Sequence, residues 1–346
     1  MVKKYNVAIV GATGMVGQAL IQVLQERNFP VGELKLLASS RSVNLTVEVM
    51  GQTYMVEEAK AEAFAGIDVA FFSAGEAISK ELGPEAVRRG AVVVDNSNAF
   101  RMDEGIPLVV PEVNPEALAN HQGIIANPNC STIQLVVALQ PLQSAVGLKR
   151  VVVASYQAVS GAGKEAVDEL ANQCQAILDG KEDFARERIP HANAKVQHQI
   201  AFNMVPQIDV LMGNGYSKEE MKIIQETRKI MGLPNLKITA TTVRVPVFTG
   251  HSEAVNVEFE LALAADAARE ILQSAPGVVV MDDPAELLYP MPQPLAGRDE
   301  VFVGRIREDQ SVEHGINMWV VADNIRKGAA TNSIQIAETL IARGQL

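Results

Sequence analysis

Residues 5–17 read Tyr-Asn-Val-Ala-Ile-Val-Gly-Ala-Thr-Gly-Met-Val-Gly, an apolar run that ends in a cluster of glycines. The apolar run predicts a buried β-strand, and the residues after the last glycine have the spacing of an amphipathic helix. Gly11 permits a tight turn, Gly14 lets backbone amides approach an anion, and Gly17 allows the helix to pack closely on the strand. The stretch therefore predicts the first βα unit of a parallel sheet, with a helix N-terminus suited to an anion.

The rest of the chain predicts an α/β fold of two domains. Short strands and helices alternate in the first third, at residues 6–10, 16–25, 34–38, 69–73, 76–89 and 91–95. That rhythm is typical of βαβ units and a parallel sheet. After about residue 149 the strand candidates are longer and lie closer together, at 151–159, 237–247, 254–262, 301–307 and 316–322. We expect one domain of residues 1–129 with a returning helix in 326–346, and an α+β domain of 130–325 with a mixed, largely antiparallel sheet.

Size, charge and cysteine content restrict the class of protein. The chain has 346 residues, 48% of them hydrophobic, and a formal net charge of -11. A surface that binds nucleic acid or an acidic membrane needs an excess of Lys and Arg, so neither partner is expected. No apolar stretch approaches the roughly 20 residues that span a bilayer, and we interpret the start, Met-Val-Lys-Lys, as leading into a strand rather than as a secretion signal. The two cysteines suit a reducing compartment, which predicts a cytoplasmic protein.

The glycine turn predicts a dinucleotide site, with a simple turn as the alternative. Its spacing is Gly-x-x-Gly-x-x-Gly rather than Gly-x-Gly-x-x-Gly. After the second predicted strand, where an acidic residue commonly contacts the ribose hydroxyls, the chain has Ser39-Ser40-Arg41-Ser42. A guanidinium among hydroxyl groups suits a 2′-phosphate, so the sequence favours NADP over NAD. Arg41 as an ordinary exposed loop cation is the competing interpretation.

Cys130 is the candidate nucleophile. It lies in Asn127-Pro-Asn-Cys-Ser-Thr, between an apolar strand at 124–126 and a helical run at 133–142. A helix N-terminus lowers the pKa of a thiol, and its amides stabilise an oxyanion. Taken alone, a lone cysteine is more often a small core residue. Cys174 has the weaker claim, because it stands in a helical pattern that predicts core packing.

His251 is the candidate proton-transfer residue among five histidines. It follows Arg244-Val-Pro-Val-Phe-Thr-Gly, where we expect a strand to end in a Thr-Gly turn that exposes the imidazole at the rim of a cleft. Arg244 is expected to point toward the same strand end and to bind a carboxylate in a bidentate manner. An interior ion pair is the alternative for Arg244. No group of Cys, His and Asp has the spacing of metal ligands, so we assign no metal.

Four motifs together resemble those of the aspartate-semialdehyde dehydrogenase family. They are Gly-Ala-Thr-Gly-Met-Val-Gly at 11–17, Asn-Pro-Asn-Cys at 127–130, Ser-Gly-Ala-Gly at 160–163 and Arg-Val-Pro-Val-x-x-Gly-His at 244–251. The resemblance runs nearly end to end, and the motifs occur in the family's order. It implies a Rossmann-like dinucleotide-binding domain followed by a catalytic and dimerisation domain, and an NADPH-dependent reductive dephosphorylation of L-aspartyl 4-phosphate to L-aspartate 4-semialdehyde. This reaction serves lysine, threonine, methionine and isoleucine biosynthesis and passes through a thioester on Cys130, with His251 as general acid/base.

The resemblance also implies roles for further residues. The substrate would be held by a cationic, acidic and amide set, namely Arg101, Asn129, Gln157, Glu219, Lys222 and Arg244. Within it, Arg101 and Lys222 would bind the phosphate, Glu219 the ammonium, Arg244 the α-carboxylate, and Gln157 would orient the substrate beside the cysteine. The cofactor would be held by Gly11, Thr13, Gly14, Met15, Val16, Gly17, Ser39, Arg41 and Ser42, and its nicotinamide end by Ser73, Gly75, Ser160, Gly161 and Asn324. Without the resemblance, Glu219 and Lys222 are simply an i,i+3 pair on a helix.

Other functions remain open from sequence. N-acetylglutamyl-phosphate reductase shares the acyl-phosphate and cysteine chemistry, but its substrate lacks the free ammonium that Glu219 would meet. A phosphorylating glyceraldehyde-type dehydrogenase is a more distant alternative. A nucleotide-sensing protein would bind NADP without thiol-dependent turnover. A cysteine acyl transferase or protease would leave the glycine turn without a purpose. A homodimer or higher homo-oligomer built on the second domain is expected from the resemblance.

Overall fold

The computed structural model describes residues 3–49 and 51–346, so Met1 and Val2 of the basic start, and Met50, lie outside the described residues. The chain divides into two compact units, the first made of Met1–Asn129 with Gly328–Leu346 and the second of Cys130–Lys327. The sequence placed the second crossing between residues 325 and 326, and the units divide two residues later. Each unit has its own sheet, which confirms the expected two-domain α/β fold.

The first unit is built on a seven-stranded sheet in the order β3-β4-β2-β1-β5-β6-β7. The strands are β1 (Tyr5–Val10), β2 (Val31–Ala38), β3 (Thr46–Val49), β4 (Gln52–Glu58), β5 (Val69–Phe72), β6 (Val92–Asp95) and β7 (Ile124–Ala126). All neighbours are parallel except the β3-β4 hairpin. Successive strands leave β1 on opposite sides, first to β2 and later to β5. A reversal of this kind opens a crevice at the carboxyl ends of the two strands, where open α/β sheets bind ligands.

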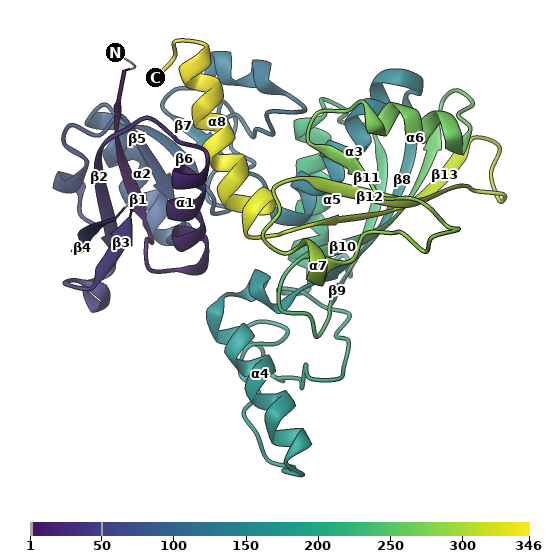
Figure 1. Cartoon of the computed structure of the whole chain (residues 1–346), viewed down its shortest axis with the longest axis horizontal. Coiled ribbons are helices and arrows are strands. Elements are labelled where there is room, and N and C mark those ends of the chain that lie inside the picture. Colours follow the sequence, from purple (N-terminus) through teal and green to yellow (C-terminus); the bar gives the residue numbers. More distant parts are fainter. Residues whose placement is uncertain (1–2, 50) are drawn as a thin grey trace. The chain divides into compact units, whose positions relative to one another are not determined.

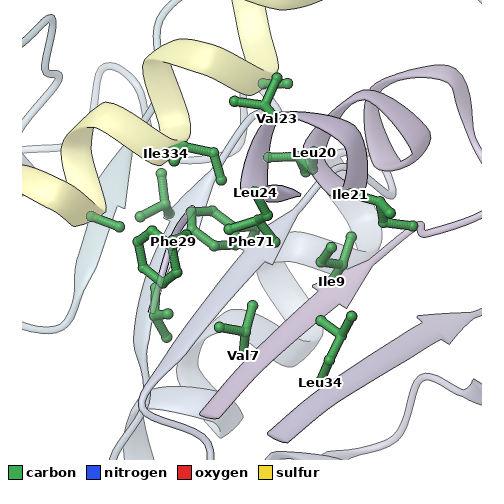
Figure 2. Packing of buried hydrophobic residues seen from close by; sticks show 14 of the residues in the cluster. Val7, Ile9, Leu20, Ile21, Val23, Leu24, Phe29, Leu34, Phe71 and Ile334 are labelled. Carbon is green, nitrogen blue, oxygen red and sulfur yellow. The ribbon is translucent and has the colours of Figure 1, made fainter. Parts of the chain in front are cut away.

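Helices cover both faces of this sheet because its strands are apolar on both sides. The helices of the first unit are α1 (Met15–Glu26), α2 (Glu76–Arg88) and α8 (Thr331–Ala342). Figure 2 shows one core, in which Leu20 and Leu24 of α1 and Ile334 of α8 pack on Ile9 and Phe71. The opposite face packs against α2 and includes Phe64, Phe72 and Leu82. The C-terminal segment thus belongs to the core of the first unit, as its helical spacing predicted.

The second unit is built on a six-stranded sheet in the order β11-β12-β13-β10-β8-β9. The strands are β8 (Leu148–Gln157), β9 (Lys237–Arg244), β10 (His251–Phe259), β11 (Val278–Val280), β12 (Val301–Glu308) and β13 (Gly315–Ala322). The four central strands pair antiparallel, while β9 and β11 add parallel strands at the two edges. The sheet is therefore mixed and largely antiparallel, as the sequence predicted.

Helices cover one face of this second sheet (Figure 1). They are α3 (Cys130–Val146), α5 (Lys218–Ile230) and α6 (Ala265–Gln273); α7 (Pro292–Leu295) is a single turn in the excursion that the prolines predicted. Burial alternates along β8 and β10, so one set of side chains is buried and the other is half-exposed. Tyr156 of β8 is half-exposed and meets Trp319 of β13, with the ring centroids 5.5 Å apart. Among the described helices only the single turn α7 packs on this side, where its Leu295 joins Phe302 and Val321 in a cluster that Trp319 packs against.

Helix α4 (Lys164–Leu178) extends away from the second sheet, together with the loop that follows it (Figure 1). We call this segment, residues 164–205, the protrusion. It packs around a small cluster, which joins Leu170 of α4 to Ile189, Ile200 and Val205 of the loop and to Val159, which precedes the protrusion. Cys174 is half-buried against this core, close to the packing role its pattern predicted. Among the described residues no helix is long and apolar enough to cross a membrane.

Candidate active site

The glycine turn is built as tightly as its sequence suggests. Gly11 has φ +86°, and a Cβ there would lie 2.7 Å from the carbonyl oxygen of Ser73. A Cβ on Gly17 would lie 2.2 Å from the carbonyl oxygen of Gly11, so the first turn of α1 packs directly on the loop. Gly14 is exposed and caps α1 without a side chain. The open amides at the start of α1 form a cradle for an anion, which any larger side chain at Gly11 or Gly17 would distort.

Two neighbouring segments border this turn. Ser73 follows β5, and its hydroxyl donates to the Val10 carbonyl oxygen at 3.3 Å. Gly75 has φ +89° and precedes α2. Both follow β5, on the β5 side of the strand reversal, and Ser73 lies against Gly11. On the β2 side, Ser40–Ser42 form one 3-10 turn with an exposed Arg41.

Arg101 and Asn129 belong to the same unit as the glycine turn. Arg101 is buried, and its guanidinium donates to the carbonyl oxygens of Asn127 at 3.0 Å and Asn96 at 2.7 Å. Asn127 is fixed in turn by Asn332 of α8, whose amide donates to its side-chain oxygen at 2.7 Å. These carbonyl oxygens fix the orientation of the buried guanidinium, which also interacts electrostatically with Asp95. Asn332 was missed from sequence because it lies more than two hundred residues away.

Cys130 is the first residue of α3 and is half-buried. It therefore stands at the positive end of a 17-residue helix, as its motif predicted. The residues that follow are almost all buried, so this helix is fixed over its length by packing in the second unit. The sulfur also lies within electrostatic range of Arg244, whose charge it favours.

His251 is fully buried, and the expectation of an exposed imidazole at the end of a strand is wrong. β10 begins at His251, and the Thr-Gly turn precedes it, so the ring enters the packed side of the sheet. Its Nδ1 accepts the backbone N–H of Ala158 at 3.1 Å. Nδ1 as acceptor leaves the proton of a neutral ring on Nε2. Burial, and then the charge of Arg244, lower the pKa of His251 to about 3.

Arg244 ends β9 and meets His251 as expected. It is 3% exposed, and its Nη1 donates to the carbonyl oxygen of Ala158 at 2.7 Å. Ala158 therefore contacts both functional side chains. Its N–H donates to His251, and its carbonyl oxygen accepts from Arg244. A Cβ on Gly161 would lie 2.9 Å from Nη1 of Arg244 and 3.2 Å from Nε2 of His251. Burial lowers the pKa of Arg244, while Glu219 and Cys130 oppose that shift.

Glu219, Lys222 and Gln157 form a second part of this cluster. Helix α5 starts with a capping box between Ser217 and Glu220, which fixes the turn that carries Glu219. Lys222 Nζ lies 3.1 Å from Glu219 and 3.3 Å from Asp209, so the i,i+3 pair considered from sequence is present. Gln157 donates to Glu219 at 3.2 Å. Asp209, which anchors Lys222 from a loop, was not predicted.

Ser160 and Asn324 meet in the second unit, near the start of β10. Their side chains are buried and lie 3.0–3.1 Å apart, and Gly250 donates its N–H to Asn324 at 2.9 Å. Asn324 thus holds the turn immediately before His251. Thr13, Met15, Val16, Ser39 and Ser42 remain at the glycine turn of the first unit and are not part of this cluster.

The second unit therefore gathers most of the predicted catalytic residues. Cys130, Gln157, Glu219, Lys222, Arg244 and His251 all lie in it, with Ser160, Gly161 and Asn324. Sequence reasoning missed one further buried group, Glu253, which has no exposed surface and whose pKa burial raises well above 4.5. The sequence prediction began this strand at residue 254, whereas β10 begins at His251, and in that frame Glu253 falls at the period of the buried positions.

The comparisons with known proteins agree along the chain. Family models described as "Semialdehyde dehydrogenase, NAD binding domain" and "Semialdehyde dehydrogenase, dimerisation domain" match residues 6–121 and 139–327. Aspartate-semialdehyde dehydrogenase of Aquifex aeolicus is 56% identical, with 98% of this chain and 99% of the relative covered. That of Bacillus subtilis is 54% identical, with 97% of each covered.

Solved structures give the same result. Aspartate semialdehyde dehydrogenase II from Vibrio cholerae, complexed with ASA, has a TM-score of 0.93 and 48% identity, with 99% of each chain covered. Aspartate semialdehyde dehydrogenase with NADP from Candida albicans has a TM-score of 0.77 and 27% identity, with 99% of this chain and 100% of that chain covered. The chain therefore belongs to the aspartate-semialdehyde dehydrogenase family of oxidoreductases.

Proposed function

We propose that the chain catalyses the NADPH-dependent reductive dephosphorylation of L-aspartyl 4-phosphate to L-aspartate 4-semialdehyde, with Cys130 as the nucleophile. The observation that carries the proposal is the cluster of a helix-start cysteine, a buried neutral imidazole and a buried guanidinium in one unit. The relative from Vibrio cholerae, complexed with ASA, supports the substrate. No feature of the described residues favours the N-acetylglutamyl substrate, because the acidic Glu219 suits a free ammonium.

The first unit fits a nicotinamide dinucleotide. The support is the turn formed by Gly11, Gly14 and Gly17, where a Cβ on Gly11 or Gly17 would clash with neighbouring backbone atoms. Exposed Arg41, flanked by Ser39 and Ser42, supplies a cation and hydroxyls for a 2′-phosphate, which supports NADP over NAD. Thr13 is exposed on the same turn, 3.5 Å from the hydroxyl of Ser42. Ser73 and Gly75 border the turn, and Ser160, Gly161 and Asn324 would serve the nicotinamide end. When bound, the cofactor supplies the hydride that reduces the acyl group.

Cys130 carries the acyl group in the proposed reaction. Its sulfur attacks the acyl carbon, the bond from that carbon to the phosphate oxygen breaks, and phosphate leaves as a thioester forms. Reduction of the thioester gives a thiohemiacetal on the same sulfur. Collapse of this adduct breaks the carbon–sulfur bond and releases the aldehyde with the thiolate. The α3 dipole and Arg244 favour the thiolate at the start and at the end.

His251 holds a proton at Nε2 when its ring is neutral, so it can donate a hydrogen bond to an oxygen that gains negative charge. Its pKa of about 3 belongs to the imidazolium, so the ring transfers a proton as an acid only after it has itself been protonated. The same low pKa makes it a poor base, because a thiol near pKa 8.5 would give up its proton at a cost of about 7 kcal/mol. Binding of a dianionic phosphate would raise the pKa of His251 and reduce that cost. His251 would therefore take the proton of the thiol only after the substrate has bound.

Each charged group of the substrate would be bound by side chains of opposite charge, and the amides would orient it. Arg244 would bind the α-carboxylate, Glu219 the ammonium, and Arg101 with Lys222 the phosphate. In the structure Glu219 and Lys222 form an ion pair at 3.1 Å. The substrate ammonium would replace Lys222 as the partner of Glu219, and the phosphate would replace Glu219 as the partner of Lys222. Gln157, held by Glu219 at 3.2 Å, would orient the acyl group, and Asn129 would help to place the phosphate.

The open face of the second sheet supports a homodimer. It is half-exposed, apolar and aromatic at Tyr156 and Trp319, and the matching family model is described as a dimerisation domain. An identical face on a second copy would cover it in a self-complementary way. Two free cysteines, one of them the nucleophile, support a reducing, cytoplasmic location.

The test is the reverse reaction. Purified protein is mixed with L-aspartate 4-semialdehyde, phosphate and either NADP or NAD, and absorbance of the reduced nicotinamide is followed. We expect NADP-dependent turnover that Cys130→Ser abolishes, with NADPH affinity retained, because serine keeps the shape but not the acidity of the thiol. Cys174→Ser is the matched control and should retain activity. Turnover by the Cys130→Ser variant would refute the mechanism, and turnover with only the N-acetylglutamyl substrate would refute the substrate.

A further inference from the structure

Glu253 is a buried carboxyl group that the proposed reaction does not use. It lies two residues after His251 on β10, so its side chain is on the same face of the sheet. Its cross-strand neighbours are Ser155 on β8 and Val320 on β13. No surface of Glu253 is exposed. The group is thus in the layer of side chains immediately beneath His251, against helix α3.

Gln134 faces Glu253 from helix α3. It follows Cys130 by four residues, so the two side chains lie on one face of the helix, one turn apart. Gln134 is 1% exposed. Within the described structure, the side-chain oxygens of Glu253 and the amide atoms of Gln134 fall outside strict hydrogen-bond geometry. The two groups are nevertheless polar neighbours, because Gln134 lowers the pKa of Glu253 as a nearby donor does.

The surroundings of the Glu253 carboxyl disfavour its charged form. Val320 is apolar, Ser155 already accepts from Gln157 at 3.2 Å, and Gln134 is a neutral amide. Desolvation raises the pKa of Glu253, and its contact with Gln134 only partly opposes the shift. A protonated carboxyl has one O–H donor and one carbonyl acceptor, which match the two ends of an amide. A neutral pair of this kind fixes a mutual orientation without placing a negative charge beside the Cys130 thiolate.

Stability alone does not explain the pair. Replacing buried polar partners by apolar groups of similar shape is often neutral or stabilising, whereas leaving one of them unpaired is costly. The pair also connects two specific elements. Gln134 lies one turn after Cys130 on α3, and Glu253 lies two residues after His251 on β10. The position of the pair between α3 and β10 therefore indicates a role in orienting these two elements rather than in stabilising the fold.

We propose that Glu253 is a positioning residue that, as the buried polar partner of Gln134, sets the orientation of Cys130 at the start of α3 relative to His251 on β10. The inference rests on the proposed function of Cys130 as nucleophile. It predicts that hydrogen bonding at this pair matters and that negative charge does not. Glu253→Gln keeps a donor and an acceptor, whereas Glu253→Met keeps only the volume.

The experiment measures Cys130 reactivity separately from turnover. In a Cys174→Ser background, the rate of alkylation by iodoacetamide is followed against pH, together with kcat, the KM for each substrate and thermal unfolding. Glu253→Gln should retain kcat and the alkylation profile to within about threefold. Glu253→Met should fold, yet lose about tenfold in kcat with the KM for NADP unchanged, and its alkylation midpoint should move to higher pH. Glu258→Gln, at a half-buried position on the opposite face of the same strand, is the matched control.

A swapped pair completes the test. Glu253→Gln combined with Gln134→Glu restores one carboxyl and one amide, and it should recover the alkylation profile that Gln134→Met loses. A Glu253→Gln variant as impaired as Glu253→Met would overturn the proposal, because charge would then be required. An unchanged alkylation profile in Glu253→Met would also overturn it. If Glu253→Met does not fold, the alkylation profiles of Glu253→Gln and of the swapped pair test the proposal instead. Failure of turnover in the wild type, with a normal alkylation profile, would count against the proposed function alone.

Discussion

Acidification should destabilise the second unit through His251. The pKa of this histidine is about 3 in the folded protein against 6.5 for the free side chain. Between these values the unfolded chain binds a proton that the folded protein does not, so stability falls as pH falls below 6.5. With the two pKa values, the loss between pH 8 and pH 5 is about 2 kcal/mol, and it grows by about 1.4 kcal/mol per further pH unit until pH 3. The group is completely buried, so solvent screening does not reduce this figure.

Urea unfolding followed by tryptophan fluorescence measures the effect. The chain has one tryptophan, Trp319, which lies on β13 of the same sheet as His251. Wild type and His251→Gln are compared at pH 8 and pH 5, and the other titrating groups cancel in the difference. We expect wild type to lose about 2 kcal/mol more than the variant. His198→Gln, at an exposed histidine, is the control and should behave as wild type. Equal losses in wild type and His251→Gln would refute the buried, neutral imidazole.

Three further perturbations test other parts of the site. Gly161→Ala places a methyl group 2.9 Å from Arg244 and 3.2 Å from His251, so kcat/KM for the semialdehyde should fall about tenfold, while Gly213→Ala, where the added atom meets open space, should be silent in the same steady-state assay. Arg41→Ala should weaken NADPH far more than NADH in a fluorescence titration, because only NADPH carries the 2′-phosphate; equal weakening of both would contradict the cofactor assignment. Glu253→Gln should stabilise the protein more at pH 8 than at pH 4 by urea unfolding, because a carboxyl with a raised pKa costs stability as pH rises above its unfolded value, and the opposite trend would show an ionised group.

Local pattern was enough to predict the architecture. The strand, turn and helix at residues 5–26 are specified by neighbouring residues, and the structure has β1, the turn and α1 there. The β3-β4 hairpin, β11 and α6 were not predicted, because they are short or weakly apolar and gain their stability from packing. Strand ends were also less certain, since β8 and β9 end earlier than the apolar pattern does.

Burial of the site depended on contacts that no local window contains. The Thr-Gly turn before His251 suggested a strand end, but the ring is covered by elements distant in sequence, including the Ala158 loop. The same holds for Asn332, which anchors the Arg101 network from the other end of the chain. The candidate catalytic residues were found through motifs and a family resemblance, whereas their charge states follow only from three-dimensional packing.

The small cluster of the protrusion, which meets the rest of the second unit at Val159, gives the molecule a region that can open locally. Few buried apolar side chains tie residues 164–205 together, so its opening free energy should be well below that of the sheet. Val205 and Arg244 exchange two backbone hydrogen bonds, of 3.0 and 2.9 Å. Amide hydrogen exchange at these two residues should therefore follow the protrusion rather than β9. Opening of the protrusion would then disturb the backbone that carries the Arg244 guanidinium. Proteases would cleave the open state, whereas a bound substrate would stabilise the closed state.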